Sequence, residues 1–246
     1  MSRKNKLTII VLFTFSVFTI IYYLTPALKS GVDKVFITIS TFLFTIFTGF
    51  FISRQGSRYS EIRKTVSVID GNFSSIYRSF GHLGKDIQDK AGKIIKTYYQ
   101  NILDNKAWDF NLKNKTTTLI DTHELLNMAS SEDPSSPLAS AVFSRIMTCL
   151  GNIQIERKNL VALSEERIPK FQWITIYSLS LVLFLALLIV IPSNNLLIES
   201  TLKGVFSTSV IIVIMLLGQL NRLELFEGTI GEHSAQDVID IIDGKK

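Results

Sequence analysis

Four threonines recur at alternating steps of three and four residues inside the uncharged apolar run Val35–Ser53, and Ile52 continues the same spacing. The four are Thr38, Thr41, Thr45 and Thr48. This spacing places their side chains on one face of an α-helix, which we call the threonine seam. Hydroxyl groups along one face of a membrane helix can line a water-filled pore. They can equally pack helices together, because Thr and Ser do this commonly in membranes.

Two arginines, Arg54 and Arg58, lie one helical turn apart where the apolar run ends. In an oligomer they could form basic rings at the cytosolic mouth of a pore, with Ile52 just inside as a hydrophobic constriction. The competing interpretation is that both guanidinium groups reach lipid phosphates. The arginines and Ile52 favour the pore, so we predict that the threonine seam and Ile52 line it.

Beyond Arg54 the same spacing continues with hydrophobic side chains, apart from Gln55. These positions are Tyr59, Ile62, Val66, Ile69, Phe73, Ile76 and Phe80. A helix in lipid hides its polar atoms, whereas a helix in water hides its apolar atoms. The change therefore predicts one continuous helix that leaves the membrane and keeps one face inward. Because a straight helix drifts by about 20° per heptad, alignment requires supercoiling or bending.

The elements that must position these residues are predicted to be four transmembrane helices. The uncharged apolar runs are Leu7–Leu28, Val35–Ser53, Phe171–Pro192 and Gly204–Gln219. A span requires roughly 20 apolar residues, and the last run is shorter, although Leu220 and Asn221 can extend it. We expect the first run to be an uncleaved span, because its apolar part is too long for a signal peptide and Thr25–Lys29 is a poor cleavage site.

The distribution of Lys and Arg predicts the orientation in the membrane. One side would carry only Lys29, Lys34 and Lys203, so the basic excess places both termini and the central segment in the cytoplasm. We expect a multi-pass protein of the bacterial inner membrane. The net charge of +5 suits an anionic lipid surface and is too mild to indicate nucleic acid as a partner.

The predicted architecture is all-α, with a cytosolic helical domain between two pairs of spans. Its segments are 1–53, an N-terminal two-span hairpin; 54–170, the cytosolic domain; 171–221, a C-terminal two-span hairpin; and 222–246, an acidic tail. Outside the spans, helices are expected at about 85–105, 117–129, 138–165 and 235–242. Ser234 and Asp237 resemble a capping box that would start the last of these helices.

No catalytic constellation is visible in the sequence. His123-Glu124 begins like a zinc-protease motif, but Asn127 occupies the position that requires a second histidine. The three histidines have no Cys or His partners at ligand spacing, and the acidic tail lacks a calcium-binding loop. We therefore expect no catalytic residue, no metal site and no cofactor.

Several short motifs, taken together, resemble the bestrophin-like membrane proteins. The run Arg58–Lys64 is followed by Asp70 and then by Arg78, and Pro169 precedes the third apolar run. The segment Leu223–Gly228 loosely matches the family's Asp-x-Pro-Phe-x-Gly end. This resemblance spans most of the chain.

The sequence departs from the family pattern at two places. Asp70 stands where the family usually has Glu, and Leu223 and Leu225 replace the Asp and Pro of the last motif. The resemblance implies likeness to bestrophins, which are oligomeric anion channels with a long cytosolic helical part, although fold does not fix function. We also predict that Asp70 and Arg78, eight residues apart, pair across helices or subunits and stabilise the assembly.

The sequence leads to two functional hypotheses. The first is a homo-oligomeric membrane ion channel that conducts anions through a pore lined by the second span. Since one chain offers one or two helices to a central axis, several copies are needed, and a pentamer is one such arrangement. Its partners would be lipid, further copies of itself and the permeating ion. The alternative is a non-conducting membrane sensor or effector scaffold that binds a cytosolic protein.

Overall fold

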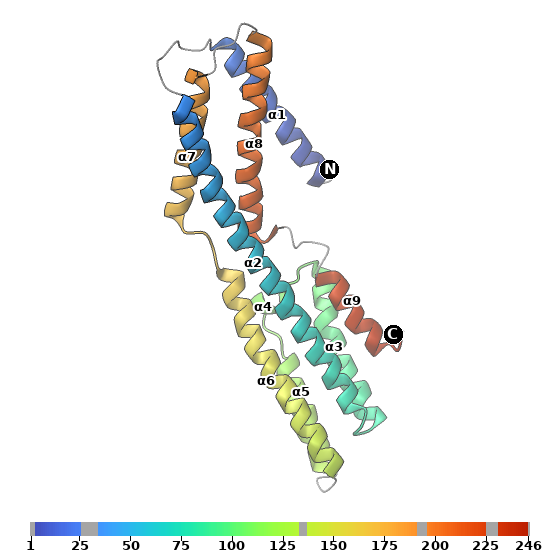
Figure 1. The fold of residues 1–246 in the computed structure, drawn as a ribbon. Helices are drawn as coiled ribbons and strands as arrows, with labels where there is room; N and C mark the ends of the chain where they lie inside the picture. Colours follow the sequence, from blue (N-terminus) through green and yellow to red (C-terminus); the bar gives the residue numbers. More distant parts are fainter. Residues whose placement is uncertain (1–2, 26–33, 133–136, 191–195, 225–230, 246) are drawn as a thin grey trace. The chain divides into compact units, whose positions relative to one another are not determined.

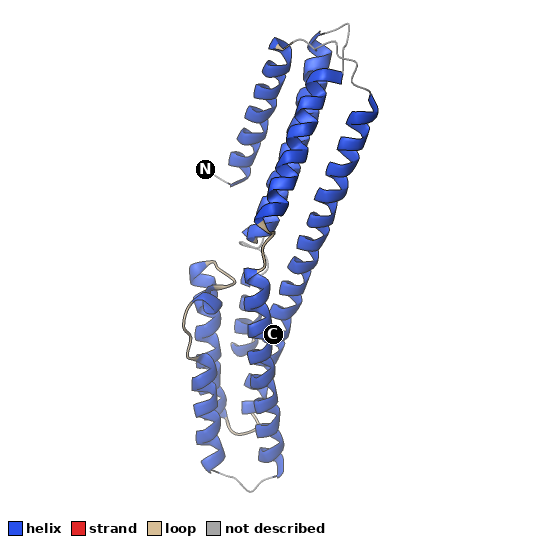
Figure 2. Cartoon of the chain, turned by 90° about the vertical axis from the view of Figure 1, so that its left-hand side faces the viewer, coloured by secondary structure: helices blue, strands red, loops and turns tan. Residues whose placement is uncertain are grey.

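The computed structural model describes residues 3–25, 34–132, 137–190, 196–224 and 231–245. Within these ranges every regular element is an α-helix, and no strand is present (Figure 2). The helices are α1 (Arg3–Leu24), α2 (Lys34–Phe80), α3 (Lys85–Asn105), α4 (Phe110–Lys113), α5 (Thr118–Glu132), α6 (Pro137–Glu165), α7 (Lys170–Val190), α8 (Leu196–Arg222) and α9 (Gly231–Ile242) (Figure 1). The all-α prediction is confirmed.

Three helical stretches of the described chain are long and apolar enough to cross a membrane. They are Val35–Phe80, Pro137–Leu188 and Leu196–Arg222. The apolar part of α1, Thr8–Leu24, is shorter. At 1.5 Å per residue it does not reach the roughly 30 Å of the hydrocarbon core. Three of the four predicted spans therefore meet the length criterion, and part of the first run lies outside the described residues.

The chain divides into two compact units, and α2 contributes to both. Unit 1 comprises residues 1–56 and 167–222, which include α1, the first half of α2, α7 and α8. Its core is formed by buried apolar side chains from α2, α7 and α8, together with Ile168. These side chains are Phe44, Phe51, Ile176, Leu183, Val210 and Leu217.

In unit 1, α1 packs along α8, as Figure 1 shows. The two helices approach closely because Gly204 has no side chain. A Cβ at this position would overlap the Oγ1 atom of Thr19 and lie 3.4 Å from the ring of Phe15. Small residues permit this kind of close helix contact in membranes, where tight packing holds helices together.

Unit 2 comprises residues 57–166 and 223–246, which include the second half of α2, α3 to α6 and α9. The hydrophobic positions of α2 predicted to face inward form part of its core. Those that are buried are Ile62, Ile69, Phe73, Ile76 and Phe80. They pack with buried side chains such as Tyr99 of α3 and Ile146 of α6. The inward face predicted for this half of α2 is confirmed.

Outside the predicted spans, the helix boundaries agree closely with those expected from the sequence, with one informative exception. The helix expected at 85–105 is α3, and the helix expected at about 138–165 is α6. The last helix, however, begins at Gly231, so Ser234 lies inside α9. The predicted capping box is therefore wrong, because the Ser234 hydroxyl bonds to Asp70 of α2.

Candidate functional site

The threonine seam lies beside the face of α2 that packs within unit 1. The packed face consists of the buried side chains of Ser40, Phe44, Thr48, Phe51 and Gln55. Of the seam, Thr48 alone shares this face. Thr38 and Thr45 are exposed in the single chain, and Thr41 and Ile52 are half-buried. Packing within one chain thus leaves Thr38 and Thr45 exposed, whereas Ile52 packs against the core of unit 1.

Two of the seam hydroxyls, those of Thr45 and Thr48, are satisfied within α2 itself. Thr45 donates its hydroxyl to the carbonyl of Thr41 at 2.8 Å, and Thr48 donates to the carbonyl of Phe44 at 2.7 Å. Ser and Thr commonly bond to the carbonyl one turn earlier in a helix. Exposed threonines can therefore tolerate an apolar environment, and the hydroxyl must rotate away from the carbonyl before it can donate to an anion.

The two arginines predicted at the mouth have different environments. Arg54 is exposed, whereas Arg58 is 4% exposed and belongs to unit 2. The Nε of Arg58 donates to the carbonyl of Leu163 at 2.7 Å, and its Nη2 donates to the carbonyl of Ser164 at 3.1 Å. These carbonyls belong to the last turn of α6, where a cation is favourable. Arg58 thus caps α6, and its role at a pore mouth stays a prediction.

Asp70 is a buried carboxylate at the meeting point of three helices in unit 2. It lies in the charged half of α2, beyond the uncharged run Val35–Ser53, and is 8% exposed. The hydroxyl of Tyr99 from α3 donates to its Oδ1 at 2.6 Å, and the hydroxyl of Ser234 from α9 donates to its Oδ2. Burial raises the pKa of Asp70, and these two hydrogen bonds partly oppose the rise.

Arg78, the predicted partner of Asp70, is exposed. Within the described part of one chain, the Asp70 carboxylate bonds to Tyr99 and Ser234 and makes no ion pair with Arg78. The intrachain form of the predicted pair is therefore not observed. A pair between subunits stays a prediction.

A charged pair that the sequence reading missed is buried at the start of α8. Lys203 and Glu199 are 2% and 6% exposed, and their Nζ and Oε1 atoms are 2.5 Å apart. The Lys203 ammonium also lies 5.9 Å from the ring centroid of Tyr22 in α1, and the Tyr22 hydroxyl bonds to Ser207 at 2.8 Å. From the sequence, Lys203 was placed among the few basic residues at the outer ends of the predicted spans. The Glu–Lys spacing of four was the available signal for pairing.

The described residues contain no group of three or more His, Cys, Asp or Glu side chains arranged to hold a metal ion. One open hollow of about 370 Å³ lies in unit 2 at the start of α5. Lys93 and Lys115 are among its lining residues, but its carboxylate, Asp121, already accepts a hydrogen bond from Thr117 at 2.7 Å. This hollow is not part of the predicted site.

Comparison with known proteins identifies the family. The bestrophin-like domain matches residues 8–230, which include most of α1 and all of α2 to α8. No curated protein and no solved structure matches the chain. The family suggests a membrane-channel kind of function, which agrees with the apolar helices described above. With nearly its whole length matched, the chain belongs to the bestrophin-like family.

Proposed function

We propose that this chain is a homo-oligomeric anion channel whose pore is lined by α2. The observation that carries the proposal is the position of Thr38 and Thr45 of the threonine seam outside the packed face of α2. A single chain leaves Thr38 and Thr45 exposed within a helix that is apolar enough to span a bilayer. Membership of the bestrophin-like family supports the same class of function.

A pore of this kind requires several copies of the chain. Each copy supplies one α2, and a ring of identical helices around a symmetry axis is the simplest closed arrangement, with a pentamer as one option. In that ring the exposed threonines would meet water, while the large apolar side chains of α2 such as Phe42 and Ile46 would meet lipid or neighbouring helices. The assembly would be a multi-pass protein of the bacterial inner membrane with cytoplasmic termini.

The proposed selectivity rests on charge rather than on the hydroxyl groups alone. The exposed Arg54 lies two residues beyond Ile52, where the uncharged run ends, and a ring of such cations would raise the local concentration of anions. Ile52 is half-buried and would narrow the pore next to this ring. Because Thr45 donates to a backbone carbonyl, we assign the threonines to wetting the pore and Arg54 to anion preference.

Chloride flux through the purified oligomer in liposomes tests the proposal. We expect chloride flux to exceed potassium flux, and Ile52→Glu to lower chloride flux by roughly fivefold or more, because a carboxylate within about 4 Å repels an anion by about 1 kcal/mol even in water. Thr45→Val should also lower flux, because it removes a hydroxyl while keeping the shape.

Thr175→Val is the matched control, because Thr175 of α7 makes the same bond, to the carbonyl of Phe171 at 3.1 Å. This variant should conduct like the natural chain. Equal fluxes from the natural chain, Ile52→Glu and protein-free liposomes would reject the pore. If the oligomer is intact and still shows no flux, the same result supports the non-conducting sensor or effector.

A further inference from the structure

The last helix, α9, packs against the rest of unit 2 along one apolar face. Ala235, Val238 and Ile239 are 1%, 2% and 5% exposed and belong to the same core as the second half of α2. α9 lies beside α3, as Figure 1 shows. An isolated helix of this length is marginal in water, so its formation depends on this contact. Docking and folding of α9 are therefore one event.

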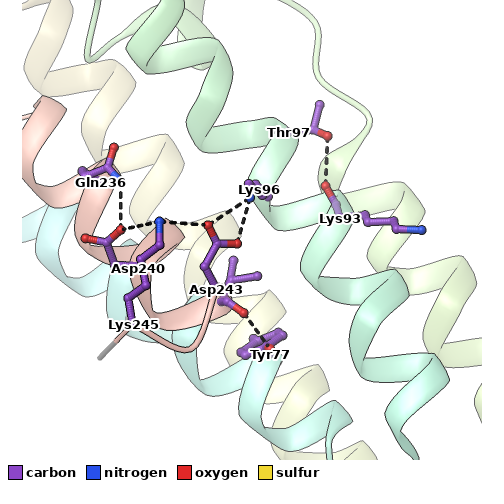
Figure 3. Close-up of polar contacts among 9 residues, drawn as sticks. Tyr77, Lys93, Lys96, Thr97, Gln236, Asp240, Asp243 and Lys245 are labelled. Atoms are coloured by element: carbon purple, nitrogen blue, oxygen red, sulfur yellow. Dashed lines mark hydrogen bonds and ion pairs between the residues drawn. The ribbon is translucent and has the colours of Figure 1, made fainter.

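Polar contacts hold the C-terminal end of α9 (Figure 3). Lys96 of α3 pairs with Asp243, with its Nζ 2.8 Å and 3.1 Å from the two carboxylate oxygens. The Tyr77 hydroxyl of α2 donates to the carbonyl of Ile242 at 3.1 Å. Gly92 of α3 makes room here, because a Cβ would lie only 3.1 Å from Ile242 and 3.2 Å from Tyr77.

The other end of α9 is held by Ser234, which donates its hydroxyl to Asp70. The groups that face or influence this carboxylate come from every helix around it. Tyr99 and Tyr98 come from α3, Asp237 comes from α9, and Arg157 of α6 acts on Tyr98. No described cation pairs with Asp70. Its charge is thus balanced by hydroxyl donors alone.

We propose that α9 is a pH-sensitive strap that closes over the Asp70 carboxyl of α2 and docks more tightly when that carboxyl is protonated. The contact with α9 hides an ionisable group that would prefer water when charged. Asp237, carried by α9 itself, adds a second negative charge to the docked state. Both effects oppose docking of α9 over an ionised Asp70.

The direction of the effect follows from linkage. In the docked state the pKa of Asp70 is raised, chiefly by burial and also by Asp237, while the bonds from Ser234 and Tyr99 lower it. Release of α9 would return Asp70 towards water and lower its pKa. Because the docked pKa is the higher one, docking is strongest below the free-state pKa and weakens as pH rises through the docked pKa.

The hydrogen bonds of the cluster can survive protonation. A protonated carboxyl can donate to one hydroxyl and still accept from the other, since Ser and Tyr hydroxyls act both as donors and as acceptors. Neutralisation therefore removes the desolvation penalty without removing the Ser234 contact. The strap acts on α2, the continuous helix that also carries the threonine seam, and its docking would depend on pH whether or not the chain conducts.

Hydrogen–deuterium exchange of the α9 backbone amides in the full-length protein tests the strap. Protection should be measured in detergent micelles between pH 5 and 8 and corrected for the intrinsic pH dependence of exchange. We expect protection to fall as pH rises, with a limit of tenfold for each unit by which the pKa differs between docked and released states. Asp70→Asn keeps the shape and does not titrate, so its protection should be independent of pH.

Two further variants make the test independent of that substitution. Ser234→Ala removes a bond that lowers the docked pKa, so the pH dependence should persist with its midpoint moved to higher pH. Asp243→Asn breaks the pair with Lys96 and should lower protection equally at every pH in this range. The proposal is overturned if the natural chain and Asp70→Asn show the same pH dependence, if protection rises with pH, or if Ser234→Ala leaves the midpoint unmoved.

Discussion

At the scale of single residues, Arg58 shows how a cation beside an apolar run can serve packing. Its guanidinium satisfies two carbonyls at the end of α6 and is buried. Arg58→Met should therefore lower the free energy of unfolding by about 2–3 kcal/mol, because hydrogen bonds to charged groups contribute about 1.5–3 kcal/mol and the carbonyls would lose their donors.

Unfolding of the purified protein by SDS or denaturant measures this effect. Arg54→Met is the control, since Arg54 is exposed and surface substitutions usually change stability by about 0.5 kcal/mol or less. Equal losses in the two variants would contradict the capping role. A larger loss for Arg58 would also explain any reduced flux of that variant without a role at a pore mouth.

From the sequence, Asp70 could be predicted as a residue that stabilises the assembly, but its partners Tyr99 and Ser234 could not be predicted. Tyr99 lies 29 residues away and Ser234 lies 164 residues away, so no helical spacing connects them to Asp70. Ser234 was assigned to a local cap because Ser followed by an acid three residues later is a local pattern. Glu199 and Lys203 are one turn apart, a spacing that permits pairing, but their burial depends on α1, which is distant in sequence.

At the scale of helices, most boundaries could be predicted because they depend on local signals. Apolar runs and their spacing predicted α2, α3, α6, α7 and α8. Which helices pack together depends on surfaces rather than on local spacing. The sequence paired the first apolar run with the second in a hairpin, whereas α1 makes its main described contact along α8. The small residue at Gly204 that permits this contact gives no signal in an apolar run.

The contact between α1 and α8 provides a prediction about Gly204. Gly204→Ala should lower the free energy of unfolding by about 1–3 kcal/mol, because an added methyl group in a packed interface forces its neighbours apart. Gly218→Ala is the matched control on the same helix, where a Cβ meets nothing within 4 Å. Thr19→Ala should restore part of the lost stability in the Gly204→Ala background. Destabilisation by both glycine variants, or no rescue, would count against the close contact.

At the scale of the whole molecule, α2 links the two units through one uninterrupted helix. The sequence located the change of environment on this helix at Arg54, where seam residues switch from hydroxylated to hydrophobic. The structure separates the units after Gly56. The inward face is continuous in unit 2, but in unit 1 the packed side chains run beside the threonine seam. Only a folded chain reveals this offset, because it depends on how α7 and α8 cover α2.

The predicted role of Arg78 in association between chains can be tested on the oligomer. Asp70 bonds within its own chain, while Arg78 is exposed, so an effect of Arg78 on association would report contacts between chains. Arg78→Glu should raise the dissociation constant of the oligomer by roughly tenfold, which corresponds to about 1.4 kcal/mol. Mass photometry over a dilution series in mild detergent measures this change.

Lys93→Glu makes the same change of charge at an exposed site on α3 and should leave the oligomer intact. Asp70→Ala should weaken the oligomer if Asp70 meets Arg78 of another subunit. If Arg78→Glu has no effect while Asp70→Ala dissociates the oligomer, Asp70 acts through the fold of its own chain, because removing it disturbs Tyr99 and Ser234 first. If both variants weaken association and Lys93→Glu does not, the two residues belong to one interface, since an exposed arginine has no comparable role within the monomer.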